Sequence, residues 1–314
     1  MPSPTPELIA DLLATLDTLS GGAHPGFRPA HARGVMYAGT FTPSVEASEL
    51  TSAPHATRPS TPVTVRFSAS AGIPTVADND PKGSSPQGMA IRFHLGDHLH
   101  TDIVSHAHNG FPARDGEEFL AFLQAVAASG PGAANPPPIV AFLAAHPKAQ
   151  QFVEAPKPIP SSFARQSYFA VTAFQFTNQH GQKRFGRFRI RPDAGNEFLT
   201  AEQAQDKPAD FLAAEMSERL TLGPVVFRVL VQLAESGDDV TDSTAVWPET
   251  RQEAAFGTIT LTERVDELAP ERRKIIFDPV PRVDGIDSAG DPLTDLRSEL
   301  YLVSGRRRRT AAIK

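Results

Sequence analysis

With 314 residues, the chain is long enough to bury a large hydrophobic core, and its 40% hydrophobic and 21% charged residues are typical of a globular protein. A net charge of -6 argues against nucleic acid as the main partner, because a protein that binds a duplex needs a positive surface. The absence of cysteine excludes disulfides, thiolate metal sites and thiolate-ligated haem. His, Tyr, Asp and Glu remain as strong metal ligands.

The N-terminal segment lacks the basic and continuous apolar parts of a secretory signal. No apolar run approaches the ~20 residues of a membrane helix. We therefore expect a soluble, cytoplasmic protein without a membrane partner, or a periplasmic one if the sequence is a processed form. The sequence allows a homo-oligomer but does not determine the oligomeric state.

The first half of the chain predicts helices and short strands. Within an N-terminal helical segment, residues 1–22, the apolar side chains of residues 8–19 have helical spacing. β-type runs separated by Pro, Gly and Asn follow at 35–41, 63–68, 89–93 and 102–104. Two helices are expected at 117–128 and 138–145, joined by a Gly- and Pro-containing loop.

A second strand-rich block begins with a predicted hairpin, in which strands at 168–177 and 184–190 flank a turn. A helix is expected at 201–214, and further strands at 225–235 and 257–261. Because the strand-rich pattern resumes after a helical insertion and no linker divides the chain, we expect one α+β domain, residues 1–314. Its sheet should be antiparallel and closed or nearly closed.

The last helix-sized segment carries a candidate metal ligand. Arg297 precedes Tyr301 by four residues, so the two side chains share a helix face. A phenol titrates near ~10, so Tyr301 could ligate iron only if a charge such as that of Arg297 stabilised the phenolate. Arg308, two turns further on, could meet a haem propionate. Alternatively, Tyr301 only anchors the helix, and residues 302–314 form a basic C-terminal tail.

A second candidate group surrounds His31. A neutral imidazole can move a proton between the two oxygens of a peroxide near pH 7. The hydroxyl of Ser68 could fix the tautomer of this ring, and Arg28 and Arg66 could pair with haem propionates. Alternatively, His31 is an ordinary histidine at the rim of a barrel, and the arginines are surface charges.

A rival metal site would lie in the histidine-rich stretch of residues 94–108. Alternate residues of a strand share a face, so His98 and His100 could hold a non-haem metal together. Asp102 follows too closely to act as the usual downstream carboxylate, and the next one is Asp115. A solvated histidine-rich hairpin is the alternative.

Taken together, these motifs resemble the haem catalases, and in particular the small catalase-related peroxidases. The resemblance runs from residue 24 to residue 309 in the order of the family, and several ordered motifs are far more specific than one. Its motifs are Arg28-Pro-Ala-His31-Ala-Arg-Gly34, Val65-Arg-Phe-Ser68, Asp80-Pro-Lys-Gly83, the run from Gly88 to Phe93, the run from Asp102 to Phe119, Val246-Trp-Pro248, Phe277-Asp-Pro279, Gly285-Ile286 and the Arg297 and Tyr301 pair.

The resemblance implies a catalase-like closed antiparallel β-barrel with surrounding helices and one haem b. It assigns His31 as the distal acid/base, with Ser68 orienting it, and Tyr301 as the phenolate ligand of the iron. The residues that it places in contact with the cofactor are Arg28, Ala30, Arg66, Phe111, Phe119, Arg297, Tyr301 and Arg308.

One position departs from the family pattern. The distal asparagine of catalases falls on His106, which we count among the catalytic residues. An amide donates a hydrogen bond without titrating, whereas a histidine can donate, accept or become charged. Asn109 could supply the missing donor if the loop shifts. The departure puts fast dismutation of hydrogen peroxide in doubt.

The resemblance implies a haem peroxidase that reduces hydrogen peroxide or organic hydroperoxides with small organic electron donors through an oxoferryl intermediate. Its catalase activity should be weak or moderate. Without the long N-terminal arm and C-terminal extension of large catalases, we expect a short, wide channel suited to organic hydroperoxides. A hydroperoxide-rearranging haem enzyme of the same fold and a haem-binding protein without turnover remain as alternatives.

Overall fold

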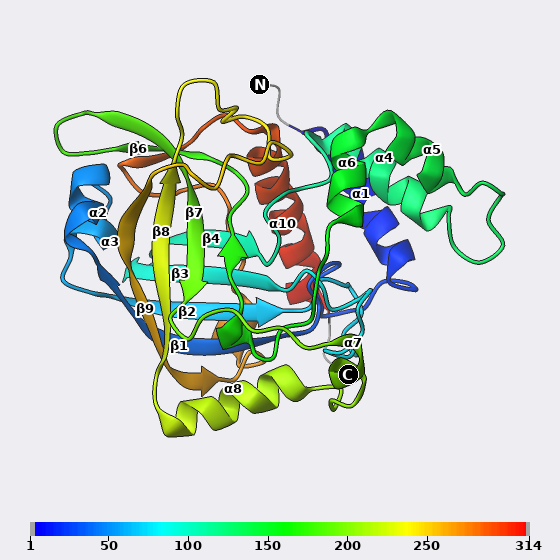
Figure 1. Cartoon of the computed structure of the whole chain (residues 1–314), viewed down its shortest axis with the longest axis horizontal. Helices are drawn as coiled ribbons and strands as arrows, with labels where there is room; N and C mark the ends of the chain where they lie inside the picture. Colours follow the sequence, from blue (N-terminus) through cyan, green and yellow to red (C-terminus); the bar gives the residue numbers. More distant parts are fainter. Residues whose placement is uncertain (1–3, 312–314) are drawn as a thin grey trace.

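The computed structural model describes residues 4–311, and its strands form one antiparallel sheet that closes into a barrel (Figure 1). The strands are β1 (Gly34–Pro43), β2 (Thr61–Ser68), β3 (Gly88–Gly96), β4 (Leu99–His106), β5 (Tyr168–Phe169), β6 (Phe174–Thr177), β7 (Lys183–Pro192), β8 (Val225–Leu233), β9 (Glu253–Val265) and β10 (Ile286–Ser288). Their order is β7-β5-β4-β3-β2-β1-β9-β8, and β8 pairs back with β7. The predicted closed antiparallel barrel is confirmed, with β6 and β10 as an extension beside β7.

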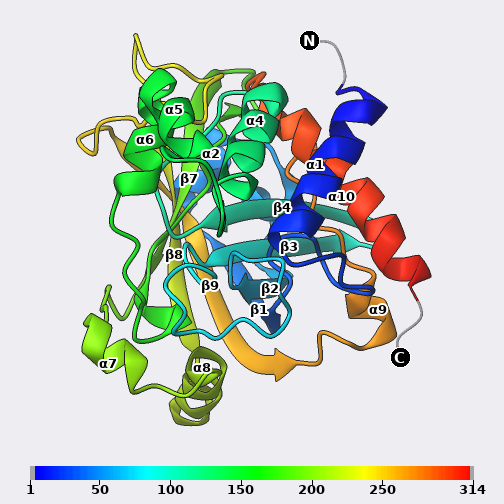
Figure 2. The same ribbon diagram turned by 90° about the vertical axis from the view of Figure 1, so that its right-hand side faces the viewer.

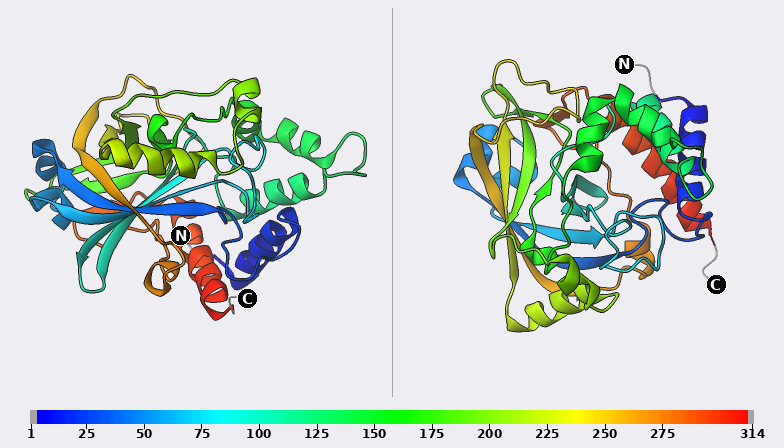
Figure 3. Two further views of the ribbon diagram at one scale, coloured as in Figure 1. Left: turned by 90° about the horizontal axis from the view of Figure 1, so that it is seen from below. Right: turned by 45° about the vertical axis from the view of Figure 1, so that its right-hand side comes forward.

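Helices lie against two sides of this barrel. They are α1 (Pro6–Leu19), α2 (Val45–Leu50), α3 (Pro54–Thr57), α4 (Gly116–Ala127), α5 (Pro138–Ala145), α6 (Pro147–Glu154), α7 (Ala201–Gln205), α8 (Phe211–Leu222), α9 (Pro270–Arg273) and α10 (Pro292–Thr310). Figure 2 shows α1 and α10 side by side in front of β3 and β4. Figure 3 shows α8 on the other side of the barrel. None of these helices, all within residues 4–311, is long and apolar enough to cross a bilayer.

The sequence of α1 explains its start and its packing. The side chain of Thr5 accepts a hydrogen bond from the backbone N–H of Leu8 at 3.2 Å, and Pro6 occupies the first helical position, where no N–H is needed. The buried leucines of α1 then pack with Leu123 of α4 and with Leu296 of α10. This apolar cluster fixes the three helices relative to one another beside the barrel.

The strand β2 shows where a site can form, because it is buried on both faces. Val65 and Phe67 belong to the apolar core inside the barrel, whereas Arg66 and Ser68 alternate with them and lie on the outer face. Polar side chains are buried at such a face only if they find partners there. The outer face of β2 to β4, under α10, therefore carries the candidate site.

Four predicted elements were wrong in extent, and one of them, the strand predicted at 257–261, is the longer β9. The predicted strand 168–177 is two strands, β5 and β6. Phe169 and Phe174 are five residues apart, whereas their partners on β7, Arg189 and Gly186, are only three residues apart, so the pairing is interrupted between them. The predicted helix 201–214 is divided into α7 and α8 around Pro208, since proline disfavours a helical residue before it. The strand predicted at 102–104 is the longer β4, which pairs with β3 over almost its whole length.

The prediction of a basic C-terminal tail at residues 302–314 also needs correction. Residues 302–310 continue α10 as a helix, and the remaining residues 312–314 lie outside the described part. Arg307 forms an ion pair with Asp17 of α1 at 2.6 Å, and Arg308 is only 5% exposed. Only part of this segment is therefore the solvated surface that the run of arginines suggested.

A histidine buried inside the barrel should make the stability of the protein sensitive to acid. His55 is buried among Phe41, Phe93 and Phe256, and its Nδ1 has no hydrogen-bond partner among the described residues. Burial lowers its pKa to about 3. The unfolded chain, with an ordinary pKa near ~6.5, binds this proton first, so the free energy of unfolding falls as the pH drops from 6.5 towards 3.

We therefore expect His55→Leu to unfold at a lower pH than the wild type. Urea unfolding at pH 7 and pH 4.5 should show that the variant loses about 2 to 3 kcal/mol less stability between these two pH values. His180→Leu, at an exposed position between β6 and β7, is the control and should lose as much as the wild type. An equal loss in His55→Leu would show that another group causes the acid sensitivity.

Candidate functional site

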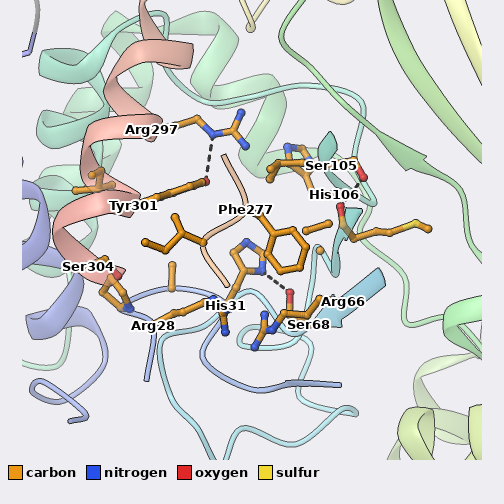
Figure 4. Close-up of a pocket in the computed structure, with 18 of the residues that line it drawn as sticks. Arg28, His31, Arg66, Ser68, Ser105, His106, Phe277, Arg297, Tyr301 and Ser304 are labelled. Atoms are coloured by element: carbon orange, nitrogen blue, oxygen red, sulfur yellow. Dashed lines mark hydrogen bonds between the residues drawn. The ribbon is translucent and has the colours of Figure 1, made fainter. Parts of the chain in front are cut away.

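All eleven predicted site residues line one pocket between the outer face of the barrel and α10 (Figure 4). Leu16 of α1 and Leu300 of α10 close its apolar side. The predicted residues are Arg28, Ala30, His31, Arg66, Ser68, His106, Phe111, Phe119, Arg297, Tyr301 and Arg308. The chain thus brings groups from its two ends together in one cavity.

The turn before β1 directs the ring of His31 into the pocket. His31 has φ of 55°, a left-handed conformation that is rare for a residue with a side chain, and its N–H donates to the carbonyl of Ser70 at 3.0 Å. Its Nδ1 lies 3.0 Å from Oγ of Ser68. Burial, followed by the charges of Arg66 and Arg297, lowers the pKa of His31 to about 4. The imidazole is therefore neutral at pH 7.

The register of the strands places a glycine where His31 and Ser68 meet. Gly88 of β3 pairs with Ser68. A Cβ at this position would lie 2.7 Å from Oγ of Ser68 and 2.9 Å from Nδ1 of His31. Gly88 was not predicted as a site residue, although a glycine at the start of a predicted β-run is a signal that backbone and side chains approach closely there.

Small side chains make the floor of the pocket flat. On the outer face, Ser68, Gly88 and His106 form one cross-strand row, and Arg66, Ala90 and Val104 form the next. Met36 of β1 pairs with Arg66 and extends the second row. The absence of large side chains at the two central positions leaves room for a planar group against the strands.

A polar network holds α10 over this floor. Arg92 and Asp102 form two hydrogen bonds of 2.9 and 2.7 Å across β3 and β4. Oδ2 of Asp102 accepts a bond from the backbone N–H of Asp278 at 2.8 Å, and Ser298 of α10 donates to Oδ1 of Asp278 at 2.8 Å. The barrel wall is thereby linked to the helix that carries Tyr301.

Arg297 and Tyr301 interact as the helical spacing predicted. Nε of Arg297 donates to the phenol oxygen of Tyr301 at 3.2 Å, and its guanidinium carbon lies 5.8 Å from the centre of the ring. Figure 4 shows the phenol oxygen pointing from α10 into the cavity. The guanidinium of Arg297 is therefore held at the oxygen atom that a metal in the pocket would contact.

Three arginines gather at one end of the pocket. Arg28 and Arg66 both donate to Oε1 of Glu267, at 2.8 and 2.7 Å, and Arg308 donates to the carbonyl of Ile275 at 2.8 Å. Burial and the charge of Arg66 lower the pKa of Arg308 to about 10, so it is still charged at pH 7. Three arginines against one carboxylate leave two positive charges, which can bind a ligand with two anionic groups. No motif in the sequence marked Glu267.

His106 lies on the outer face of β4, opposite Gly88. Both ring nitrogens are buried, and neither has a hydrogen-bond partner among the described residues. Burial, followed by the charge of Arg297, lowers its pKa to about 3, so the ring is neutral at pH 7. A neutral imidazole offers one donor and one acceptor to a ligand. Asn109, the alternative donor, does not line the pocket.

The apolar wall comes from two aromatic residues that the resemblance had assigned. The rings of Phe111 and Phe119 lie 5.1 Å apart, and Phe111 also lies 6.5 Å from the ring of His106. Phe119 comes from α4, so the apolar cluster of the helices continues into the pocket.

The rival site in the histidine-rich hairpin receives no support. His98 lies in the turn between β3 and β4 with φ of 60°, and His94 pairs with His100 across the two strands. Within residues 4–311, no group of three or more His, Asp or Glu side chains could hold a metal ion.

Comparisons with known proteins agree with this geometry. The model of the catalase family matches residues 26–313. A catalase-related peroxidase of Mycolicibacterium paratuberculosis is 34% identical over 91% of this chain and 90% of its own, and one of Synechococcus elongatus is 31% identical over 91% and 85%. Catalase-2 of Bacillus subtilis is 30% identical over 87% of this chain but only 42% of its own. The chain therefore belongs to the catalase family and is an oxidoreductase of the peroxidase and catalase type.

Proposed function

We propose that the chain is a single-domain haem b peroxidase that reduces hydrogen peroxide and organic hydroperoxides with small organic electron donors, with weak or moderate catalase activity. One observation carries this proposal. A neutral histidine with an orienting hydroxyl, a tyrosine beside an arginine and a cluster of excess positive charge all line the same pocket.

The residues of the pocket fit haem b. The flat floor at Gly88 and Ala90 suits a planar macrocycle, and the two excess charges of the arginine cluster match two propionates. Tyr301 would hold the iron as a phenolate, with Arg297 stabilising the negative charge. Ala30, Phe111 and Phe119 would contact the ring system. When bound, the haem supplies an iron centre that accepts one oxygen of a peroxide and then the electrons of a donor.

His31 would carry the proton during cleavage of the peroxide. Its ring is neutral, so the nitrogen that does not face Ser68 can take a proton from one peroxide oxygen and return it to the other. The Ser68 hydroxyl at Nδ1 fixes the orientation of the ring. The charges of Arg66 and Arg297 disfavour the imidazolium, which promotes the return of the proton.

His106 would set the balance between dismutation of hydrogen peroxide and oxidation of an organic donor. Its neutral ring can accept a hydrogen bond as well as donate one, so it orients a peroxide less strictly than an amide donor does. We expect His106→Asn to raise hydrogen peroxide dismutation, relative to oxidation of a dye donor, about tenfold. Oxygen evolution and dye oxidation, measured on the same haem-loaded samples, give this ratio.

The control for this prediction is His108→Asn. His108 lies two residues further on, but it packs on Phe152 and does not line the pocket. The same substitution there should leave the ratio as in the wild type. If both variants had the wild-type ratio, His106 would have no part in choosing between dismutation and peroxidation.

An absorption spectrum after haem reconstitution, followed by peroxide-dependent oxidation of a dye, tests the proposed function. We expect a Soret band that reports one haem per chain, and dye oxidation that needs both peroxide and haem. A protein that cannot be loaded with haem contradicts the proposal. Loading without dye oxidation would support the haem-binding protein without turnover, and consumption of fatty hydroperoxide without a donor would support the rearranging enzyme.

A further inference from the structure

The segment that follows β9 crosses the end of the pocket where the three arginines gather. It begins after Val265 and ends before Phe277, and these two residues are buried in one small apolar cluster on the barrel. The ends of the segment are therefore fixed close together, as in an Ω-loop. Figure 2 shows its short helix α9 beside the end of α10. We call residues 266–276 the rim segment.

The rim segment separates the pocket from the outside at this end. Ile276 lines the pocket, whereas Glu267 and Leu268 line a second cavity of about 570 Å³ on the other side of the arginines. Arg28 and Arg308 line both. A movement of the segment away from α10 would therefore open the pocket where the propionates are expected.

The rim segment has little core of its own. None of the side chains that the structure describes within it is buried, and Leu268 is 64% exposed. Its backbone–backbone hydrogen bonds, within the described residues, all stay inside the segment. An element with few buried contacts and no strand partner can open locally while the rest of the protein stays folded.

The arginine cluster ties the rim segment to the rest of the molecule. Arg28 and Arg66 both donate to Oε1 of Glu267, at 2.8 and 2.7 Å. Arg28 and Arg308 donate to the carbonyl of Ile275, at 3.3 and 2.8 Å. The arginines that are expected to bind the haem propionates thus also hold the rim segment in place.

Two further guanidinium groups complete these contacts. Arg92 of β3 donates to the carbonyl of Ile276. Arg273, inside the segment, lies 3.5 Å from the carbonyls of Arg308 and Ala311 at the end of α10. Every hydrogen bond between the rim segment and the rest of the described chain therefore involves an arginine side chain.

The charge of the arginine cluster couples the rim segment to the cofactor. Burial, followed by the charges of Arg66 and Arg308, lowers the pKa of Arg28, because Glu267 neutralises only one of the three cations. Nε of Arg28 and Nη1 of both Arg66 and Arg308 have no hydrogen-bond partner among the described residues. Two propionates could bind these nitrogens without displacing Glu267, and they would remove the repulsion between the arginines.

We propose that the rim segment is the gate through which haem enters and leaves the pocket, and that Glu267 is a positioning residue that holds this gate closed. The inference rests on the proposed function, because it takes haem as the occupant. In the haem-free chain, repulsion within the arginine cluster favours the open gate. In the loaded chain, the propionates neutralise the cluster and the gate closes. By linkage, the closed gate in turn strengthens the binding of haem.

Limited trypsin digestion tests the gate, because Arg272, Arg273 and Lys274 all lie in the rim segment. We expect cleavage after these residues, located by mass spectrometry, to be about tenfold faster in the haem-free protein than in the haem-loaded protein. Lys183 and Arg184, exposed in the hairpin of β6 and β7, are the internal control. Cleavage there should be equally fast in both forms.

Glu267→Gln tests the residue that holds the gate, since it keeps the shape of the side chain and removes its charge. In the haem-loaded variant, we expect cleavage in the rim segment and transfer of haem to apomyoglobin both to become about tenfold faster, as for the loss of a charge-assisted hydrogen bond. Glu271→Gln is the matched control. Glu271 belongs to the same segment, but it is exposed and lies 3.7 Å from its neighbour Arg272, so this variant should behave as the wild type does.

Three results would overturn the inference while the proposed function stands. One is equally fast cleavage of the rim segment with and without haem. Another is haem transfer from Glu267→Gln that is unchanged or slower than from the wild type. The third is cleavage of Glu267→Gln that becomes faster at Lys183 as well, which would show a general loss of stability. Protection of the rim segment by haem, without oxidation of a dye donor, would support the gate and contradict the peroxidase. A chain that does not load haem would contradict both.

Discussion

Tyr301→Phe should remove most of the affinity of the chain for haem. The substitution deletes only the phenol oxygen, to which Arg297 donates at 3.2 Å. The arginine cluster still attracts the propionates, but no other strong ligand comes from α10 in the described pocket. We expect haem to dissociate at least about 100-fold faster, as expected when a bond worth about 3 kcal/mol or more is lost. Transfer of haem to an excess of apomyoglobin, followed in the Soret band, measures this rate.

The matched control is Tyr37→Phe. Tyr37 is fully buried in the barrel, and its hydroxyl has no partner among the described residues, so this substitution also deletes a buried phenol oxygen. Haem transfer from Tyr37→Phe should be as slow as from the wild type. A Tyr301→Phe protein with the wild-type spectrum and the wild-type rate of haem transfer would show that Tyr301 only anchors the helix.

The site residues that the sequence could predict are those whose chemistry is visible in a short motif. Arg297 and Tyr301 are four residues apart on a helix, and Arg308 continues their face, so their proximity follows from helical geometry alone. The same geometry explains the error about the tail. Within the basic run, Arg308 is buried, whereas Arg306, Arg307 and Arg309 are exposed. The helical spacing from Tyr301 distinguishes Arg308 from its neighbours, although all four residues are arginines.

The residues that were missed owe their position to strand register and chain packing. Gly88 meets His31 only because β2 and β3 pair in one register, and Glu267 joins two arginines that lie about 200 residues or more before it. His106 was predicted as a site residue from the family resemblance, whereas the burial of its two ring nitrogens follows from the packing of α4, α10 and the loop at Phe111 around the pocket. A single sequence does not contain these contacts.

His31→Ala should abolish peroxide cleavage while the protein keeps its haem. His31 lies in the turn before β1, whereas Tyr301, the expected ligand of the iron, lies on α10. The substitution therefore removes the acid/base and leaves the expected ligand in place. A positioned acid/base contributes about 10²- to 10⁴-fold, so we expect kcat/KM for peroxide to fall about 10³-fold. Stopped-flow measurement of the Soret change after mixing with peroxide gives this rate.

A second variant and the pH profile distinguish loss of the imidazole from disturbance of the turn. His31→Asn removes the acid/base, and asparagine adopts a left-handed φ more readily than alanine, so both variants should be equally slow if the ring is what matters. In the wild type, a pKa of about 4 predicts a rate of peroxide cleavage that is constant from pH 8 to about 5 and falls as His31 takes up a proton near pH 4. Both variants should lack this fall. Wild-type rates in either variant would exclude His31 as the group that moves the proton, and with it the role of Ser68 in orienting that ring.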